Sequence, residues 1–303
     1  MILKPILEIC SLNDFFPHIF YQKSKERMFH FIIFMMVLNK YKKFMKREIK
    51  ELKRIARGNL QGNYITLMNA FMTCNILVSL AEMPFMLVRD EVFLSASNII
   101  YYVAVVLIHI ASVILTAGQY HMHLQTARTG KTSTTELFTP ARNHSDRFIF
   151  TELILFVIYA LCLFPVIGAS VCITLYESMQ SYLFALILSI IGGILTLYVT
   201  LNFGLVYFVM NDNHNLSMLE ALKYTKNLVH HHKKRYLYLQ CSFLGMLLLV
   251  ALSFGIGIFW VHPYMTQTTA LFYLDVKGEL DMVLDEKRKK NPAPKPTVIN
   301  HYV

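Results

Sequence analysis

Long apolar runs separated by short basic segments dominate the sequence. Four runs with at most one charged residue each cover positions 64–88, 92–118, 148–176 and 182–210, and a fifth, 236–274, has no Lys, Arg, Asp or Glu. Each of the first four is long enough to cross a hydrocarbon core of about 30 Å, which takes about 20 helical residues. The runs lack the alternation of apolar and polar positions that a membrane β-barrel needs. The pattern therefore predicts an all-α protein, a polytopic membrane helical bundle.

The fifth run is too long for one membrane helix, because a helix over 236–274 would extend about 58 Å. The stretch SFGIG, Ser253 to Gly257, lies near its midpoint, and glycine tolerates the backbone angles of a turn. All but one of the 29 Lys and Arg residues fall in segments 1–63, 119–147, 211–235 and 275–303. Because basic segments stay on the cytoplasmic side of a membrane, the run is predicted to turn back at SFGIG. We expect six transmembrane helices with both termini in the cytoplasm, and a re-entrant hairpin within 253–274 is the alternative.

Two basic segments beside the apolar runs are predicted to form amphipathic helices. Segment 45–63 has basic residues around one apolar helical stripe, formed by Ile49, Leu52, Ile55 and Ala56. Such a helix suits the inner leaflet, where each basic residue contributes about 1 kcal/mol against anionic lipid. Segment 215–235 repeats the pattern and is predicted as a cytoplasmic helix. These assignments leave 64–274 as the transmembrane domain and 275–303 as a cytoplasmic tail that we expect to be disordered.

The composition supports a membrane protein over a soluble one. Of 303 residues, 55% are hydrophobic and 16% are charged, with a mean hydropathy of +0.44, whereas soluble domains carry about a quarter charged residues. The net charge of +10 lies in blocks between the apolar runs, so nucleic-acid binding is not indicated. The five cysteines form no C-x-x-C pair, and no disulfide framework or zinc site is expected. No signal peptide is evident in residues 1–12.

Three segments of the sequence are distinctive: REIKELKRIARGNLQGNY, SMLEALKYTKNLV and FGIGIFWVHPYMTQTTALFY. Together they resemble a bacterial family of multi-pass membrane proteins, Domain of Unknown Function 975. The stretch REIKELKRIARGNLQGNY is similar to the family's basic helix before its first span, and SMLEALKYTKNLV is similar to its loop helix. The stretch FGIGIFWVHPYMTQTTALFY is similar to its most specific succession of residues. The matching positions are Gly255, Gly257, Trp260, Pro263, Tyr264, Phe272 and Tyr273. The resemblance covers roughly 45–274, and it implies a membrane location and a helical fold but no established activity.

The family-like sequence begins at a methionine, Met45. We hypothesise that Met45 is the physiological start and that 1–44 is an over-extended reading frame. The alternative is a genuine extension bound at the membrane interface, since its apolar stretch 28–38 is too short to span a bilayer. Peptides from 1–44, recovered from the native host, would refute the hypothesis.

A few polar side chains in the apolar runs are candidates for chemistry, because ionisable groups are costly inside a membrane. They are Glu82, His109, Asn202 and His262, together with Glu152. The two glutamates lie near predicted span ends, where they can reach headgroup water. A neutral His109 is expected to bond to a neighbouring helix, and His262 to a carbonyl that Pro263 leaves unpaired. No motif indicates a catalytic residue, a cofactor or a metal site.

These observations predict a non-enzymatic integral membrane protein of a bacterial plasma membrane, handling or responding to a small solute, peptide or lipid. The alternative is a structural or accessory membrane subunit that binds anionic lipid or a partner protein. The expected partners are the lipid bilayer, with anionic lipid at its inner leaflet, and an unidentified membrane protein. A polar cavity at mid-depth containing His109 and Asn202 would favour transport, whereas a dry bundle would favour the accessory role.

Overall fold

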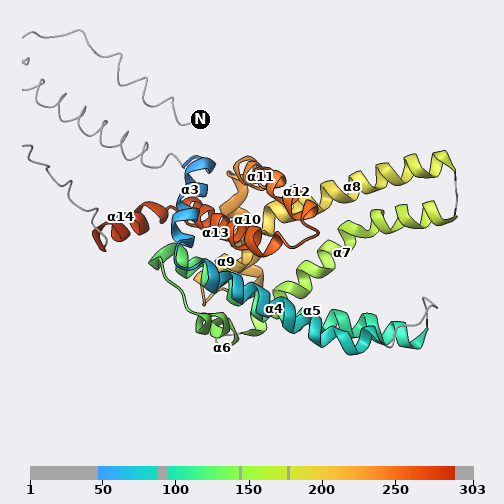
Figure 1. The fold of residues 1–303 in the computed structure, drawn as a ribbon. Helices are drawn as coiled ribbons and strands as arrows, with labels where there is room; N and C mark the ends of the chain where they lie inside the picture. Colours follow the sequence, from blue (N-terminus) through green and yellow to red (C-terminus); the bar gives the residue numbers. More distant parts are fainter. Residues whose placement is uncertain (1–46, 88–94, 143–144, 176–177, 291–303) are drawn as a thin grey trace, which may run out of the picture. The chain divides into compact units, whose positions relative to one another are not determined.

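A computed structural model describes residues 47–87, 95–142, 145–175 and 178–290. The described residues form helices and connections without a strand (Figure 1), which confirms the predicted all-α class. In chain order the helices are α3 (Ile49–Leu60), α4 (Tyr64–Met86), α5 (Ala96–Thr129), η2 (Thr134–Phe138), α6 (Thr139–Arg142), α7 (Ser145–Leu175), α8 (Met179–Phe203), α9 (Val206–Asp212), α10 (Met218–His230), α11 (Lys233–Cys241), α12 (Leu244–Leu252), α13 (Ile258–Lys277) and α14 (Leu280–Lys290). The predicted extension 1–44 lies outside the described residues.

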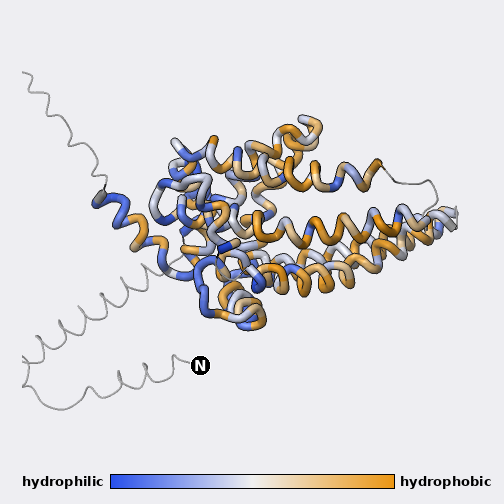
Figure 2. Tube along the Cα trace, turned by 90° about the horizontal axis from the view of Figure 1, so that it is seen from below, coloured by the Kyte–Doolittle hydropathy of each residue, from blue (hydrophilic) through white to orange (hydrophobic). Residues whose placement is uncertain are grey.

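Five segments of the described chain are long and apolar enough to cross a membrane, and α13 is not among them. They are Tyr64–Met86, Ala96–Thr129, Ser145–Thr174, Met179–Asp212 and Lys233–Leu252. Figure 2 shows hydrophobic positions along the α4–α5 and α7–α8 pairs, with hydrophilic positions collected at one end. The large apolar side chains of these pairs are exposed on the protein surface, as is typical of residues that face lipid. The multi-pass membrane character predicted from the sequence is confirmed at this level.

The α4–α5 pair is antiparallel with a register fixed by two contacts. At one end Asn63 Nδ2 donates to the Gly130 carbonyl at 2.7 Å, and farther along Glu82 Oε1 lies 3.1 Å from His109 Nδ1. This register places Glu82 opposite the middle part of the apolar run 92–118. Glu82 is therefore deeper than its position near the end of α4 suggested, because α5 continues beyond α4 at that end.

Two glycines allow close helix contacts. A Cβ atom at Gly192 would lie 2.6 Å from Val166 Cγ2 across the α7–α8 contact, and one at Gly204 would lie 2.5 Å from the Tyr236 hydroxyl. A Cβ atom at Gly193 would meet no heavy atom within 4 Å. The fourth apolar run is divided near Gly204 into α8 and α9, so its last part belongs to the polar end of the protein.

Helix α3 uses its apolar stripe against protein rather than against lipid, which corrects our expectation for segment 45–63. Leu52 and Ala56 are fully buried, and α3 packs on α13 and α5. The amphipathic pattern was recognised correctly, but its apolar face is covered because α13 lies across it. The basic residues Arg54 and Arg57 of α3 lie outside this apolar stripe and are exposed.

The last apolar run turns back, as predicted, between α12 and α13. Phe254 and Gly255 have positive φ angles of 53° and 87°, and the left-handed region favours glycine. At Gly257 a Cβ atom would lie 2.8 Å from Ser253 Oγ. A second break at Ser242–Phe243 separates α11 from α12 and leaves α12 nine residues long. Nine residues extend about 14 Å, half of a hydrocarbon core.

The predicted disorder of the tail 275–303 is wrong for its first part. Helix α13 continues to Lys277, and α14 covers Leu280–Lys290. Helix α14 is held by Arg47 Nη2, which pairs with Asp281 Oδ1 at 2.6 Å, and by Lys287 Nζ, which donates to Asn59 Oδ1 at 3.0 Å. These contacts come from α3 and the segment before it, so the sequence of the tail alone did not reveal them.

Candidate functional site

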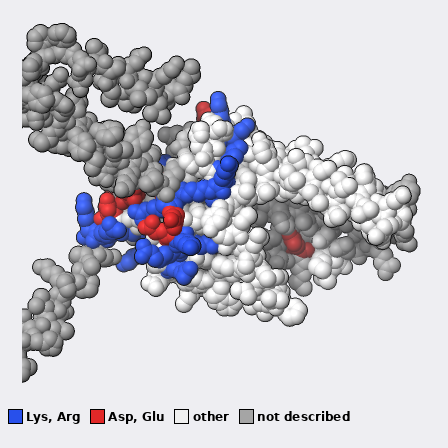
Figure 3. Space-filling view, turned by 90° about the horizontal axis from the view of Figure 1, so that it is seen from above, with Lys and Arg blue, Asp and Glu red and all other residues white. Residues whose placement is uncertain are grey.

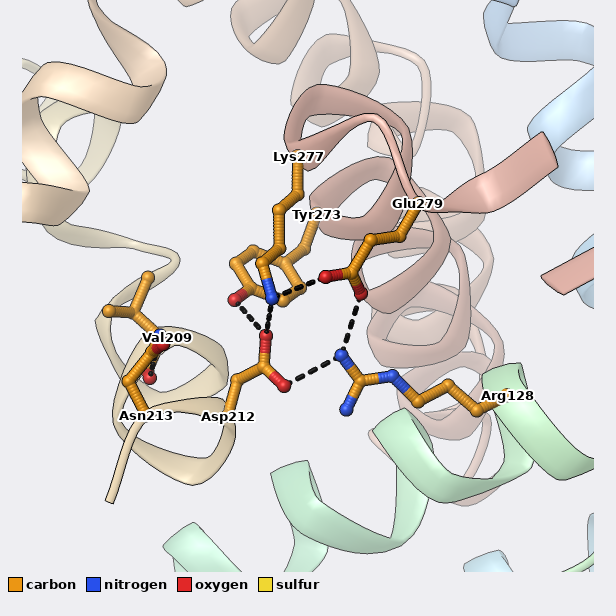
Figure 4. A network of polar contacts seen from close by, with 7 residues as sticks. All are labelled: Arg128, Val209, Asp212, Asn213, Tyr273, Lys277 and Glu279. Carbon is orange, nitrogen blue, oxygen red and sulfur yellow. Dashed lines mark hydrogen bonds and ion pairs between the residues drawn. The ribbon is translucent and has the colours of Figure 1, made fainter. Parts of the chain in front are cut away.

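A network of ion pairs joins the ends of α5, α9 and α13 at the hydrophilic end of the described chain (Figure 4). Arg128 Nη2 lies 2.6 Å from Asp212 Oδ1 and 2.8 Å from Glu279 Oε2. Lys277 Nζ contacts Asp212 Oδ2 and lies 2.5 Å from Glu279 Oε1, while the Tyr273 hydroxyl donates to Asp212 Oδ2 at 2.7 Å. The Asp212 carboxylate is only 7% exposed. Each charged group here has a partner of opposite sign, so the network is suited to holding helices together.

Two further ion pairs connect the start of α11 to α13 and the segment before α3 to α14. Arg235 Nη1, at the start of α11, lies 2.5 Å from Asp275 Oδ2 near the end of α13. Arg47, before α3, pairs with Asp281. Figure 3 shows Lys, Arg, Asp and Glu gathered at this end, with the rest of the visible surface mostly uncharged. Each helix pair therefore leaves from, and returns to, one charged end.

The signature positions predicted in 254–273 divide between the turn and the buried part of α13. Gly255 and Gly257 shape the turn, and Trp260 is about half exposed, its carbonyl accepting a hydrogen bond from the Tyr64 hydroxyl. Pro263 lies inside α13 and is buried. These residues fix where the hairpin sits against the start of α4.

The aromatic signature residues pack α13 into the protein. Phe272 stacks on Tyr236 with ring centroids 5.3 Å apart, and Tyr264 contacts Phe243 edge-to-face at 6.0 Å. Tyr273 is fully buried and belongs to the Asp212 network. The motif is therefore a packing and anchoring element, with Tyr273 as its polar contact.

Among the predicted intramembrane candidates, the structure pairs Glu82 with His109. His109 Nδ1 donates to the Val105 carbonyl at 3.0 Å, and the same nitrogen faces Glu82 Oε1 at 3.1 Å. His109 therefore contacts both its own helix and the neighbouring helix α4. The Oε1 atom of Glu82 is buried and accepts no hydrogen bond from the described residues. An acceptor of this kind is costly unless a donor reaches it.

A cavity of about 550 Å³ lies beside Glu82, between α4 and the start of α13. Asn75, Ser79 and Glu82 recur on one face of α4 and contribute its polar lining, and Phe259 of α13 contributes an apolar wall. Most of the other lining residues are methionine, leucine and isoleucine. The cavity offers an apolar wall, small polar groups and the Glu82 carboxylate.

A comparison with known protein families identifies the family of this chain. Residues 45–279 match the family described as protein of unknown function DUF975. The chain belongs to the DUF975 family. The match includes the Asp212 network, the Glu82–His109 pair and every signature position. No curated protein and no solved structure matches this DUF975 chain.

Other predicted candidates of the DUF975 chain lie apart from Glu82 and His109. Asn202 is buried in α8 and donates to the Tyr198 carbonyl at 2.6 Å. Glu152 accepts a hydrogen bond from the Tyr207 hydroxyl at 2.5 Å. The buried His262 Nδ1 has no hydrogen-bond partner among the described residues, and the ring stacks on Phe71 with centroids 4.0 Å apart.

Sequence reasoning missed a buried polar pair between α5 and α13 of the DUF975 chain. His123 Nδ1 lies 2.9 Å from Gln267 Oε1, and both side chains are buried. The two positions are 144 residues apart, so only the contact between their helices shows the pair. The recurrence of polar residues on α13 at Gln267 and Thr268, inside an apolar run, was the available signal.

Proposed function

We propose that this DUF975 protein is a non-enzymatic membrane protein with both termini in the cytoplasm, four full crossings and one re-entrant hairpin. Basic residues concentrate at the end where the helix pairs begin and return, which supports a cytoplasmic assignment for that end. The α12–α13 hairpin takes the place of two of the six crossings expected from the sequence. The plasma membrane of a bacterium remains the proposed location.

Two contacts support a hairpin that enters only one leaflet. Lys53 Nζ donates to the Ser242 carbonyl at 2.8 Å, which keeps the start of α12 at a level where a cation is hydrated. Phe259 and His262, at the start of α13, both contact Phe71. Helix α4 continues about 22 Å beyond Phe71 to Met86, so the turn lies well short of the far end of α4.

We propose that the protein binds an amphipathic solute at the Glu82 cavity. The observation that carries this proposal is the Glu82 carboxylate, which lines the cavity and whose buried Oε1 faces His109 without a hydrogen bond from the described residues. A ligand that carries an ammonium or hydroxyl group beside an alkyl chain matches the Glu82 carboxylate and the apolar wall. Figure 3 shows acidic atoms in a hollow of the otherwise uncharged surface.

Binding is favoured over catalysis by the surroundings of His109. No hydroxyl or thiol within the described ranges bonds to its ring, so the Glu82–His109 pair has no attached nucleophile. A different observation favours the alternative of an accessory subunit. The charged groups of the network around Asp212 pair with one another, so the network is occupied by its own contacts.

The test compares dodecylammonium with dodecanoate, using calorimetry on the purified full chain in nanodiscs of zwitterionic lipid. We expect dodecylammonium to bind saturably and dodecanoate to bind at least tenfold more weakly. Glu82→Gln should abolish this preference, because the amide presents a donor and carries no charge. Glu152→Gln is the matched control, since Glu152 already has a partner in Tyr207. Equal preference in the parent and Glu82→Gln proteins would contradict the proposal.

A further inference from the structure

A second cavity lies between the end of α3, the start of α4 and the α12–α13 hairpin. Its volume is about 470 Å³, within the range of small-molecule pockets. It shares no lining residue with the Glu82 cavity. Leu60, Met246, Val261 and Tyr264 give it apolar walls, and Trp260 lies at its border. The space is suited to a hydrocarbon chain.

Arg57 is the basic residue that lines this cavity. Its guanidinium carbon lies 5.9 Å from the centroid of the Tyr264 ring, and it forms no ion pair with the described residues. Lys53 lies one turn earlier on α3, and its Nζ is 4.3 Å from the centroid of the Phe243 ring. Burial, followed by the neighbouring Arg57 charge, lowers the pKa of Lys53. The cavity therefore has an unneutralised guanidinium at its edge, next to apolar walls.

The level of the cavity coincides with the expected membrane boundary. The Tyr64 hydroxyl donates to the Trp260 carbonyl, which places the Trp260 ring near the start of α4. Tyrosine and tryptophan are enriched at the membrane–water interface, where one part of each ring is hydrated and the other is apolar. Large apolar side chains continue from there around the hairpin turn, and Phe254 is 97% exposed.

We propose that this cavity binds one anionic phospholipid of the leaflet into which the hairpin inserts, with its phosphate at Arg57 and part of an acyl chain against Met246 and Trp260. Charge complementarity selects an anionic headgroup over a zwitterionic one, and the continuity between the cavity and the exposed apolar hairpin provides the path for the chain. The site is independent of solute binding at Glu82.

Trp260 is the single tryptophan of the chain, so its fluorescence reports on this cavity. The full chain is placed in phosphatidylcholine nanodiscs that contain increasing fractions of dibrominated phosphatidylglycerol or dibrominated phosphatidylcholine. We expect the anionic lipid to quench Trp260 at about fivefold lower mole fraction than the zwitterionic lipid, the effect of one basic residue at a membrane surface. Equal quenching by the two lipids would overturn the proposal.

Variants of two arginines separate the cavity from general surface charge. Arg57→Gln should abolish the preference and Arg57→Lys should retain most of it, while Arg54→Gln should leave it unchanged because Arg54 does not line the cavity. Arg57 is exposed, so its substitution leaves the core intact. A preference that survives Arg57→Gln would overturn the proposal. Inorganic phosphate at millimolar concentration should not relieve the quenching, and relief would indicate a free-anion site in place of a lipid site.

Discussion

The α7–α8 pair and the α12–α13 hairpin are both apolar helical hairpins, but their side chains face different surroundings. Large apolar residues of α7, such as Leu161 and Phe164, are 69% and 72% exposed. In α13, by contrast, Leu271, Phe272 and Tyr273 are fully buried against protein. Burial therefore separates the exposed α7–α8 pair from α13, which packs on α3, α4 and α5. Helix α12 has no buried residue and resembles the long pair in this respect.

The comparison shows two different ways of holding an apolar hairpin. The α7–α8 pair is long enough to span, and it depends on close packing at Gly192. The α12–α13 hairpin has a first helix of nine residues and is anchored at its base by Tyr273, Lys277 and Asp275. Ion pairs at the charged end thus hold the base of this hairpin.

The largest expected effect is the difference in labelling between the two turns. In a cysteine-free background, Met179→Cys at the α7–α8 turn should react with an impermeant maleimide added outside intact cells. Phe254→Cys should not react, because the hairpin turn lies inside the bilayer. Lys223→Cys in α10 is the cytoplasmic control and should react only after permeabilisation. Labelling of Phe254→Cys from outside would mean that the α12–α13 hairpin crosses the whole membrane, as the α7–α8 pair does, and would refute the re-entrant hairpin.

The anchoring of the short hairpin is tested by Asp212→Ala. The substitution leaves Arg128 and Lys277 without a shared carboxylate, and we expect it to lower the free energy of unfolding by about 3 kcal/mol. Asp285→Ala is the control, since the Asp285–Arg288 pair is 3.7 Å long and mostly exposed, so its loss should cost less than about 0.5 kcal/mol. Denaturation in mixed micelles, followed by circular dichroism, measures both. Similar losses in the two variants would refute the anchoring role.

The packing of the long pair is tested by two adjacent glycines. Gly192→Ala should destabilise the protein by about 1–2 kcal/mol, because the new Cβ atom would press on Val166. Gly193→Ala meets no neighbour within 4 Å and should be neutral or slightly stabilising. The same denaturation measurement applies, and an equal effect of the two substitutions would show that α7 and α8 do not rely on this contact.

The smallest expected effect concerns Lys287, which docks α14 beside the base of the short hairpin. Burial lowers the pKa of Lys287 from 10.5 to about 8. Between these pH values the unfolded chain binds more protons than the folded chain, so the free energy of unfolding should rise with pH across this window. Lys287→Met should remove the contribution of Lys287 to this pH dependence. The free energy of unfolding should then rise less between pH 8 and pH 10 than in the parent protein. An unchanged pH profile in the variant would contradict the assignment to Lys287.

Part of the candidate site could be predicted from residue type and position. Charge and apolarity identified Glu82 and His109 as unusual, and Gly255 was correctly placed in a turn. Their partners could not be predicted, because the Glu82–His109 contact depends on the register of α4 against α5. The Asp212 network was missed for the same reason, since its members lie far apart in sequence and each looked like an ordinary charged residue of a loop.

The sequence by itself determined the helical class, the apolar runs and the reversal at Ser253 to Gly257, because chain length, hydropathy and glycine conformation are local properties. The packing of that reversal against the rest of the protein was decided by tertiary structure, through the contacts of Lys53 with Ser242 and of Phe259 with Phe71. The same holds for the apolar stripe of α3 and for α14, whose surroundings are set by α13 and Arg47. Burial is a property of neighbours, and a run of apolar letters does not state whether those neighbours are lipid or protein.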